Sequence, residues 1–227
     1  MDKPFESIYE DNHLIAVNKA AGVLVQGDST GDAPLSELVK AYIKEKYNKP
    51  GEVFLGVVHR IDRPVTGVVV LARTSKALER MNALFRGRDT KKTYWAIVTT
   101  KPERPEGVLV HWLIKDEKRN KTTAFNSEAS GGLRSELSYR LIASSHGMFL
   151  LEVCPLTGRP HQIRVQLASM GCVIKGDVKY GDATPNKDGS ICLHARRLEF
   201  VHPVKKEPVT IEADLPSNEY WQKFTSV

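Results

Sequence analysis

An aspartate close to two arginines is the feature of this sequence that most clearly suggests catalytic chemistry. Asp62 lies between Arg60 and Arg63, in a short charged segment at residues 59–64 that separates two apolar runs. Neighbouring guanidinium groups favour the ionised form of a carboxylate even where burial opposes it. A carboxylate held in this way could attack an electron-poor carbon or stabilise positive charge on it. A structural ion pair on a surface turn is the alternative that the segment alone leaves open.

The apolar runs on either side of this segment, 53–58 and 67–72, are expected to be buried strands, so that Asp62 lies in the loop between them. Further strands are predicted by apolar and β-branched runs at 7–10, 14–19, 94–99, 107–155 (several, with turns at 131–132 and 146–147), 193–200 and 209–213. Helices are predicted at 34–47, from a cap at Thr74 or Ser75 onward, from Pro160 to Gly171, and near 218–224. These runs predict an α+β fold with a mainly antiparallel mixed sheet and flanking helices.

Length and charge bound the class of protein. A chain of 227 residues without repeats or a long linker is expected to form one domain. Its net charge is +6, and residues 51–100, the stretch around Asp62, hold nine Lys/Arg against four Asp/Glu. A basic face beside a candidate active site suits a polyanionic substrate such as RNA.

Several kinds of chemistry are excluded by missing motifs. Neither a dinucleotide-binding nor a P-loop pattern occurs, nor does a metal-binding spacing of Cys and His, so neither a nucleotide cofactor nor a metal is expected. The first residues do not resemble a signal peptide, and no apolar run approaches the roughly 20 residues of a membrane helix. Three widely spaced cysteines, Cys154, Cys172 and Cys192, indicate reduced thiols in a cytoplasmic protein. A monomer is expected.

The segment around Asp62 has a characteristic continuation, because Thr66-Gly67 and an apolar run follow it directly. Other segments then come in a fixed order, namely Y-E-D with L-I-A-V-N-K at 9–19, K-T-Y-W-A at 92–96, G-R-P-H-Q-I-R-V at 158–165, I-K-G-D with Y-G at 174–181, and L-H-A with L-x-F-x-H-P at 193–203. Together they resemble the RluA family of pseudouridine synthases over nearly the whole chain. Several ordered motifs are far more specific than any one alone.

The departures from that family pattern are few. Ile61 stands where the family usually has Leu, Ala20 where it has Pro, and Pro160 where it has Thr. The missing Thr hydroxyl at position 160 leaves a capping or substrate contact open. An S4-type RNA-binding domain is not expected, so residues 1–227 would form a single catalytic domain that recognises its RNA unaided.

The resemblance implies a pseudouridine synthase fold with a central active-site cleft, and the isomerisation of a specific uridine in rRNA or tRNA. The bond from C1′ to N1 of uracil breaks, the base rotates, and C1′ rejoins at C5, without a cofactor. Asp62 would be the catalytic carboxylate, acting either on C1′ or on a ribose proton. Tyr94 would contact the uracil, and Arg164 would pair with Asp62 and aim it.

The resemblance also implies residues that bind the substrate. Arg60 would help to evict the target base, and Leu193 would pack beneath it. Thr66 is expected to bind the substrate, and His161 and Gln162 are expected to fix loops or make backbone contacts. Phosphate contacts are expected from four cations near the end of the second helix, Arg86, Arg88, Lys91 and Lys92. His59 and His194 are expected to be structural histidines.

Two other functions remain open from the sequence. A non-catalytic RNA-binding module would need the basic surface but not Asp62. A hydrolase acting on a nucleoside or sugar would release free uracil and would ordinarily need a second carboxyl group as general acid. Transfer RNA and ribosomal RNA are both open as substrates.

Overall fold

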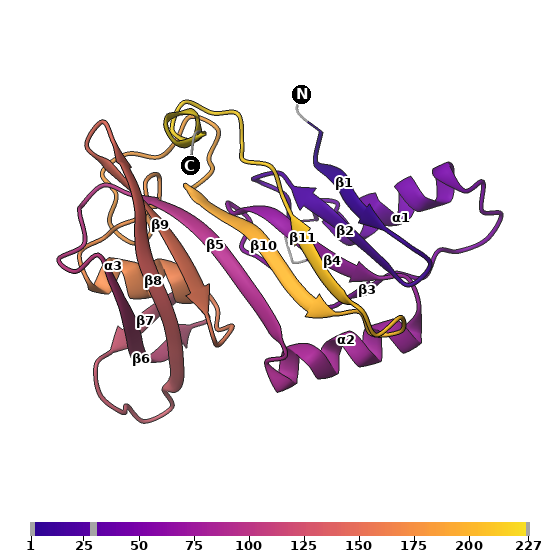
Figure 1. The fold of residues 1–227 in the computed structure, drawn as a ribbon, viewed down its shortest axis with the longest axis horizontal. Helices are drawn as coiled ribbons and strands as arrows, with labels where there is room; N and C mark the ends of the chain where they lie inside the picture. The colour runs from indigo at the N-terminus through magenta and orange to yellow at the C-terminus, as the bar shows by residue number, and fades with distance from the viewer. Residues whose placement is uncertain (1–2, 28–30, 226–227) are drawn as a thin grey trace. The chain divides into compact units, whose positions relative to one another are not determined.

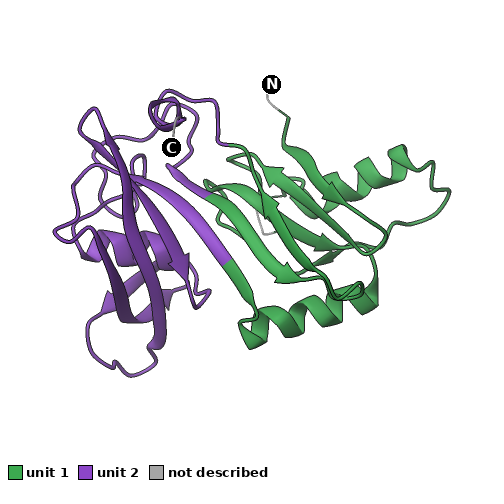
Figure 2. Cartoon of the chain, viewed as in Figure 1, with its two compact units in different colours: residues 1–91, 195–214 green, residues 92–194, 215–227 purple. Residues whose placement is uncertain are grey.

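The computed structural model describes residues 3–27 and 31–225 (Figure 1). The chain forms two compact units (Figure 2). The first unit comprises residues 1–91 and 195–214, and the second comprises residues 92–194 and 215–227. Strands β5 and β10 each contribute residues to both units. That the two units form a single catalytic domain over residues 1–227 stays a prediction.

The first unit is built on a sheet in the strand order β1-β2-β4-β10, with β11 beside β10 and β3 beside β4. Its strands are β1 (Phe5–Glu10), β2 (Leu14–Lys19), β3 (Gly56–Val57), β4 (Thr66–Ala72), β10 (Leu193–Val201) and β11 (Pro208–Glu212). The β1–β2, β2–β4 and β10–β11 pairs are antiparallel. The hairpin predicted at residues 7–19 is therefore confirmed.

Strand β3 is much shorter than the strand predicted at residues 53–58. Only Gly56 and Val57 pair with β4, opposite Ala72 and Leu71. The reason is that β4 pairs with β2 along its length from Gly67 to Ala72 and has β10 as its other neighbour. The run at 53–58 therefore finds little free edge to pair with, although it still buries Val53 and Leu55.

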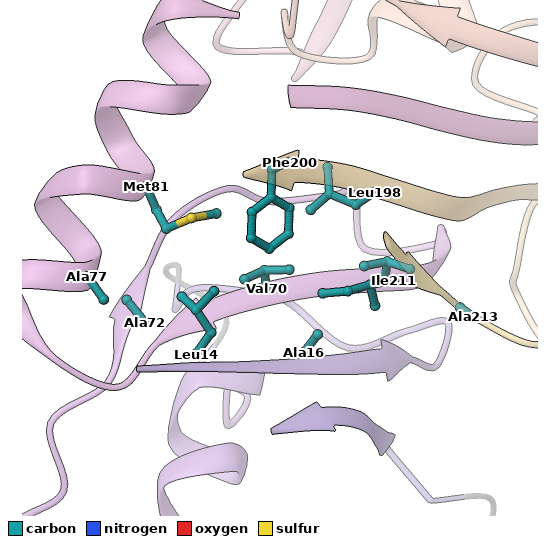
Figure 3. Close-up of a cluster of buried hydrophobic side chains, with 11 residues drawn as sticks. Leu14, Ala16, Val70, Ala72, Ala77, Met81, Leu198, Phe200, Ile211 and Ala213 are labelled. Atoms are coloured by element: carbon teal, nitrogen blue, oxygen red, sulfur yellow. The ribbon is translucent and has the colours of Figure 1, made fainter. Parts of the chain in front are cut away.

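Two helices belong to the first unit, α1 (Leu35–Lys46) and α2 (Ser75–Gly87). Both lie where the sequence predicts them, and the Thr74 side chain caps α2 by accepting a hydrogen bond from the Ala77 amide at 3.2 Å. A cluster of apolar side chains from α2 and the sheet forms a core (Figure 3). The residues labelled there are Leu14, Ala16, Val70, Ala72, Ala77, Met81, Leu198, Phe200, Ile211 and Ala213. Each large aliphatic side chain buried in this way contributes about 1.5–3 kcal/mol.

The second unit contains an antiparallel sheet in the order β5-β9-β8-β6-β7. Its strands are β5 (Thr90–Val98), β6 (Glu106–Asp116), β7 (Lys121–Phe125), β8 (Leu133–Ser145) and β9 (Met148–Pro155). The predicted turn at 146–147 joins β8 to β9 with His146 and Gly147 at positive φ, 50° and 73°. The α+β class predicted from the sequence is confirmed.

Helix α3 (Gln162–Ser169) is shorter than predicted, and its residues 162–167 are all buried. Arg164 is therefore only 5% exposed. The helix begins after Pro160 because His161, the N-cap residue, has a left-handed backbone with φ 54°. A short 3-10 helix, η1 (Trp221–Phe224), follows in the same unit.

Candidate functional site

The loop that carries Asp62 connects β3 to β4 within the first unit. Ile61 is buried, Asp62 is half-buried and Arg60 is exposed, so the three neighbouring side chains have different surroundings. The Val65 amide donates to the Asp62 carbonyl at 3.0 Å and closes a tight turn ahead of β4. The loop thus has a defined backbone shape, with an apolar anchor directly before the carboxylate.

A buried lysine ties this loop to the end of β2. Lys19 is fully buried, and its ammonium donates to the carbonyls of Ala20 and Val23 at 2.8 Å and of Arg63 at 3.2 Å. Burial lowers the pKa of Lys19 to about 7, and the negative charge of Asp62 opposes this shift. Sequence reasoning missed this residue, although a lysine that ends an apolar strand before a glycine turn is a visible signal.

The Arg63 side chain, next to Asp62, forms contacts that hold the loop. Its Nε donates to the Gly22 carbonyl at 2.9 Å, and its Nη2 pairs with the Asp32 carboxylate at 2.6 Å. The Gly22 amide in turn donates to the Arg63 carbonyl at 2.9 Å. Arg63 therefore joins the Asp62 loop to the segment that follows β2.

His59 anchors the other end of the same loop. Its Nε2 accepts a hydrogen bond from the Val70 amide at 3.0 Å, and its ring stacks on Phe85 of α2 with 4.8 Å between centroids. An Nε2 that accepts carries no proton, so the neutral ring has its proton on Nδ1. This geometry fits the structural role that the sequence favours for His59.

The start of β4 approaches β10 very closely. Thr66 is buried, and Gly67 has φ 112°, a backbone conformation that other residues rarely adopt. A Cβ atom on Gly67 would overlap the backbone of Ala195 in β10. The Thr66-Gly67 pair therefore fixes where the Asp62 loop ends.

In the second unit, Tyr94 is half-buried on β5, opposite Val153 of β9. Lys92 on the same strand is not simply an exposed cation, because its ammonium donates to the Thr157 carbonyl at 3.2 Å. Thr157 leads into α3, so Lys92 supports the loop before that helix. Leu193 is 3% exposed at the start of β10.

Gln162 organises the turn that leads into α3. Its side-chain oxygen accepts hydrogen bonds from the Thr157 hydroxyl at 2.8 Å and the Arg159 amide at 3.0 Å. Its side-chain nitrogen donates to the Glu136 carbonyl of β8 at 3.1 Å. The loop-fixing part expected of Gln162 is thus visible in its contacts.

Arg164 forms a buried ion pair that sequence reasoning did not anticipate. Its Nε and Nη2 donate to the two carboxylate oxygens of Asp177, at 2.7 and 2.8 Å. The two side chains are 6% and 1% exposed. Its guanidinium carbon also lies 5.1 Å from the centroid of the Tyr180 ring. A bidentate pair of this kind fixes the plane of the guanidinium group.

Of the four expected phosphate-binding cations near α2, three are exposed and Lys92 is half-buried. Arg86, Arg88 and Lys91 are exposed, and Arg88 ends the helix with a left-handed backbone, φ 63°. Lys91 forms an ion pair with Glu199 at 3.4 Å, with 63% of its side chain exposed. The side chains of Arg86 and Arg88 thus lie within reach of a polyanion.

The structure brings the expected residues together in two groups, one in each unit. Arg60, Asp62 and Thr66 belong to the Asp62 loop and the strand that follows it. Lys92 and Gln162 both contact Thr157, and His161 precedes Gln162 in the same turn. The expected pairing of Asp62 with Arg164 joins residues of different units and stays a prediction.

Over residues 3–27 and 31–225, no cluster of three His, Cys, Asp or Glu side chains could hold a metal ion. Within the same residues, none of the helices has the length and apolar character needed to cross a membrane. His194 is fully buried, with its ring 5.7 Å from that of Trp221, in keeping with a structural role.

Known proteins share this fold and these segments. The family model for RNA pseudouridylate synthase matches residues 13–169. Ribosomal large subunit pseudouridine synthase C of Vibrio cholerae is 33% identical over 217 residues, covering 93% of this chain and 66% of that protein. The tRNA pseudouridine synthase C of the same organism is 32% identical over 239 residues, covering 97% of this chain and 94% of that protein.

A solved structure agrees with these sequence relatives. Human RNA pseudouridylate synthase domain containing 4 is 25% identical and superposes with a TM-score of 0.77, over 93% of this chain and 88% of that one. This chain belongs to the RNA pseudouridylate synthase family, which confirms the resemblance and the class of enzyme predicted from the sequence. The chain spans about two thirds of the length of the related ribosomal enzymes.

Proposed function

We propose that this chain converts a specific uridine in structured rRNA or tRNA to pseudouridine. The family match over residues 13–169 carries the proposal, since that range includes Asp62, Tyr94 and Arg164. Relatives that act on ribosomal RNA and on tRNA, by their names, are similarly identical to this chain, at 33% and 32%. Both classes of RNA are therefore included in the proposal.

The chemistry centres on Asp62. Breaking the bond between C1′ and N1 of uracil builds positive charge on C1′, which a nearby carboxylate stabilises or captures. The same carboxylate can instead remove a ribose proton, and the proposal includes both routes. After the base rotates, C5 bonds to C1′ and loses its proton, while N1 gains one. Atoms and electrons balance without a redox partner or a second substrate, so we propose that no cofactor or metal takes part.

Arg164 and Tyr94 are proposed to complete the catalytic group. A guanidinium has five N–H donors, and the two hydrogen bonds to Asp177 come from Nε and Nη2. We expect Arg164 to pair with Asp62 as well and to keep it ionised and aimed. Tyr94 is expected to contact the uracil ring, in keeping with its half-buried position on β5.

Reaching a base in folded RNA requires extruding it, which costs a few kcal/mol. Arg60 is exposed next to Ile61 and Asp62, so we expect its guanidinium to fill the place that the target base leaves. Leu193 is expected to pack beneath the extruded uracil. Thr66, His161 and Gln162 are expected to hold the loops that contact the RNA backbone.

Phosphate binding is proposed for the exposed cations at the end of α2 and the start of β5. Arg86, Arg88 and Lys91 lie within six residues of one another along the chain. Lys92 is included, although its ammonium also donates to Thr157. Contacts of this type make RNA affinity fall steeply with salt, because bound counterions are released.

We further expect the protein to be a cytoplasmic monomer.

The direct test uses tRNA and rRNA transcripts tritiated at C5 of uracil. The proposal predicts that the purified protein releases tritium to water and that Asp62→Asn does not, although both bind the RNA. Release of free uracil would indicate a hydrolase instead. Equal activity of wild type and Asp62→Asn would exclude Asp62 as the catalytic carboxylate, and RNA binding without any tritium release would favour a non-catalytic module.

A further inference from the structure

The turn after α3, residues 176–181, contacts the Arg164 side chain in two ways. Asp177 accepts two hydrogen bonds from the guanidinium edge, at 2.7 and 2.8 Å. The Tyr180 ring lies against the guanidinium, with 5.1 Å between the guanidinium carbon and the ring centroid. A carboxylate that holds the edge and a ring that supports a face together leave a planar group little freedom to rotate.

The hydroxyl of Tyr180 forms hydrogen bonds with residues other than Arg164. It accepts a hydrogen bond from the Thr122 amide of β7 at 2.9 Å, and it lies 2.8 Å from Nδ1 of His161. Because the oxygen accepts from Thr122, its own proton can be donated to His161, which places the proton of the neutral imidazole on Nε2. Burial raises the pKa of Tyr180, so the phenol keeps this proton at neutral pH.

A second contact closes the connection between β7 and the start of α3. The Thr122 hydroxyl donates to the Pro160 carbonyl at 3.0 Å. Thr122 therefore contacts both Tyr180, through its amide, and the residue before His161, through its hydroxyl. Strand β7, the first turn of α3 and the Asp177–Tyr180 turn form one connected group of hydrogen bonds.

We infer that Tyr180 is a positioning residue for Arg164. Its ring fixes the guanidinium together with Asp177, and its hydroxyl fixes the start of the helix from which Arg164 projects. The catalytic consequence rests on the proposed function, in which Arg164 aims Asp62. Misplacement of a catalytic group by about 1 Å can cost roughly 100-fold in rate, so loosening this support should reduce turnover.

Simple packing is the competing explanation, since Tyr180 is only half-buried and could merely fill space. Removing one oxygen tests this directly, because Tyr180→Phe keeps the ring and its packing. The inference predicts that kcat at saturating RNA falls about tenfold while KM changes less than about threefold. Tyr139→Phe is the matched control, since Tyr139 is a buried tyrosine of β8 in the same unit and bonds only distantly, at 3.4 Å, to the Arg104 carbonyl.

A double-mutant cycle separates positioning from a general loss of fold. If Tyr180 acts through Arg164, adding Tyr180→Phe to Arg164→Lys should lower kcat by less than about twofold further. An unchanged kcat for Tyr180→Phe would overturn the inference. So would a full tenfold loss in the Arg164→Lys background, or a Tyr180→Phe chain that does not fold.

A measurement independent of activity covers the case in which the wild type releases no tritium. The Arg164 Nε–H resonance, identified by its loss in Arg164→Lys, should exchange slowly with solvent in the wild type. Tyr180→Phe should accelerate that exchange about tenfold, whereas Tyr139→Phe should leave it unchanged. Equal exchange in wild type and Tyr180→Phe would contradict the inference. Missing tritium release with the predicted exchange would count against the proposed function alone.

Discussion

In the first unit the Asp62 loop is held by hydrogen bonds to its backbone and by the His59 and Arg63 side chains, whereas in the second unit the Arg164 guanidinium is itself held by neighbouring side chains. Lys19 donates to three backbone carbonyls around that loop, and Val65 closes it with an amide. Around Arg164 the contacts come instead from the Asp177 carboxylate and the Tyr180 ring. We therefore expect the loop to keep its position when an amide of the same shape replaces the Asp62 carboxylate, and Arg164 to respond to changes in its neighbours.

The largest effect is expected from Asp62→Asn. Because Asn keeps the shape of Asp, and because Lys19, His59 and Arg63 also hold the loop, this variant should fold and bind RNA like the wild type while kcat falls about 10⁴-fold. Single-turnover tritium release, thermal unfolding and RNA binding check the three parts. A large loss of thermal stability would show that the carboxylate also supports the loop. It would contradict the expected difference between the loop and Arg164.

Gly67→Ala should be the most damaging change to the backbone support of the first unit. The residue has φ 112°, and an added Cβ atom would overlap Ala195. Strain and overpacking together should cost about 4 kcal/mol of unfolding free energy. Urea denaturation measures this, with Gly131→Ala as the control, since its φ is also positive but nothing lies near its Cβ position. Equal losses in both variants would mean that φ strain alone accounts for the effect.

The buried Arg164–Asp177 ion pair should matter to stability mainly because each side chain needs the other. Removing one partner should destabilise the fold more than replacing both. Asp177→Leu leaves the Arg164 guanidinium buried without this carboxylate and should cost about 3–5 kcal/mol. The double variant Arg164→Met/Asp177→Leu should recover most of that stability and yet remain inactive. Chemical denaturation and tritium release check the two halves. A double variant as unstable as the single one would show that the pair is needed for folding itself.

Lys19 should make stability depend on pH. Its folded-state pKa is about 7 against an ordinary value of 10.5, so between these values the unfolded chain binds a proton that the folded chain has released. The free energy of unfolding should therefore rise by up to about 3 kcal/mol from pH 7 to pH 9.5. Lys19→Met should lack this rise. Parallel pH profiles for the two proteins would exclude Lys19 as its source.

The smallest effect is expected from the exposed arginines at the end of α2. Arg86→Gln/Arg88→Gln should weaken RNA binding by less than about tenfold and reduce the slope of log affinity against log salt by about 1–2. Lys44→Gln/Lys49→Gln removes the same charge from another exposed stretch and serves as the control. Indistinguishable salt slopes for the two double variants would exclude a specific phosphate contact at this helix end.

The elements and the Asp62 loop could be predicted because their signals are local. Apolar periodicity marks the helices and most strands, and a charged segment between two apolar runs marks the loop. The shortness of β3 could not be predicted, since it depends on β2 and β10 occupying the edges of β4. Nor could the Lys19 contacts, which join residues 44 positions apart, or the burial of Arg164, which is set by Asp177. These features depend on tertiary pairing that periodicity does not report.

The most direct test of the central claim is to identify the product. RNA treated with the protein would be digested to nucleosides, and these would be separated by chromatography and identified by retention time against authentic uridine and pseudouridine, which have the same mass. The account predicts that pseudouridine appears at the expense of uridine, that no free uracil appears, and that Asp62→Asn gives unchanged uridine. Free uracil from the wild type, or pseudouridine formed equally well by Asp62→Asn, would contradict it.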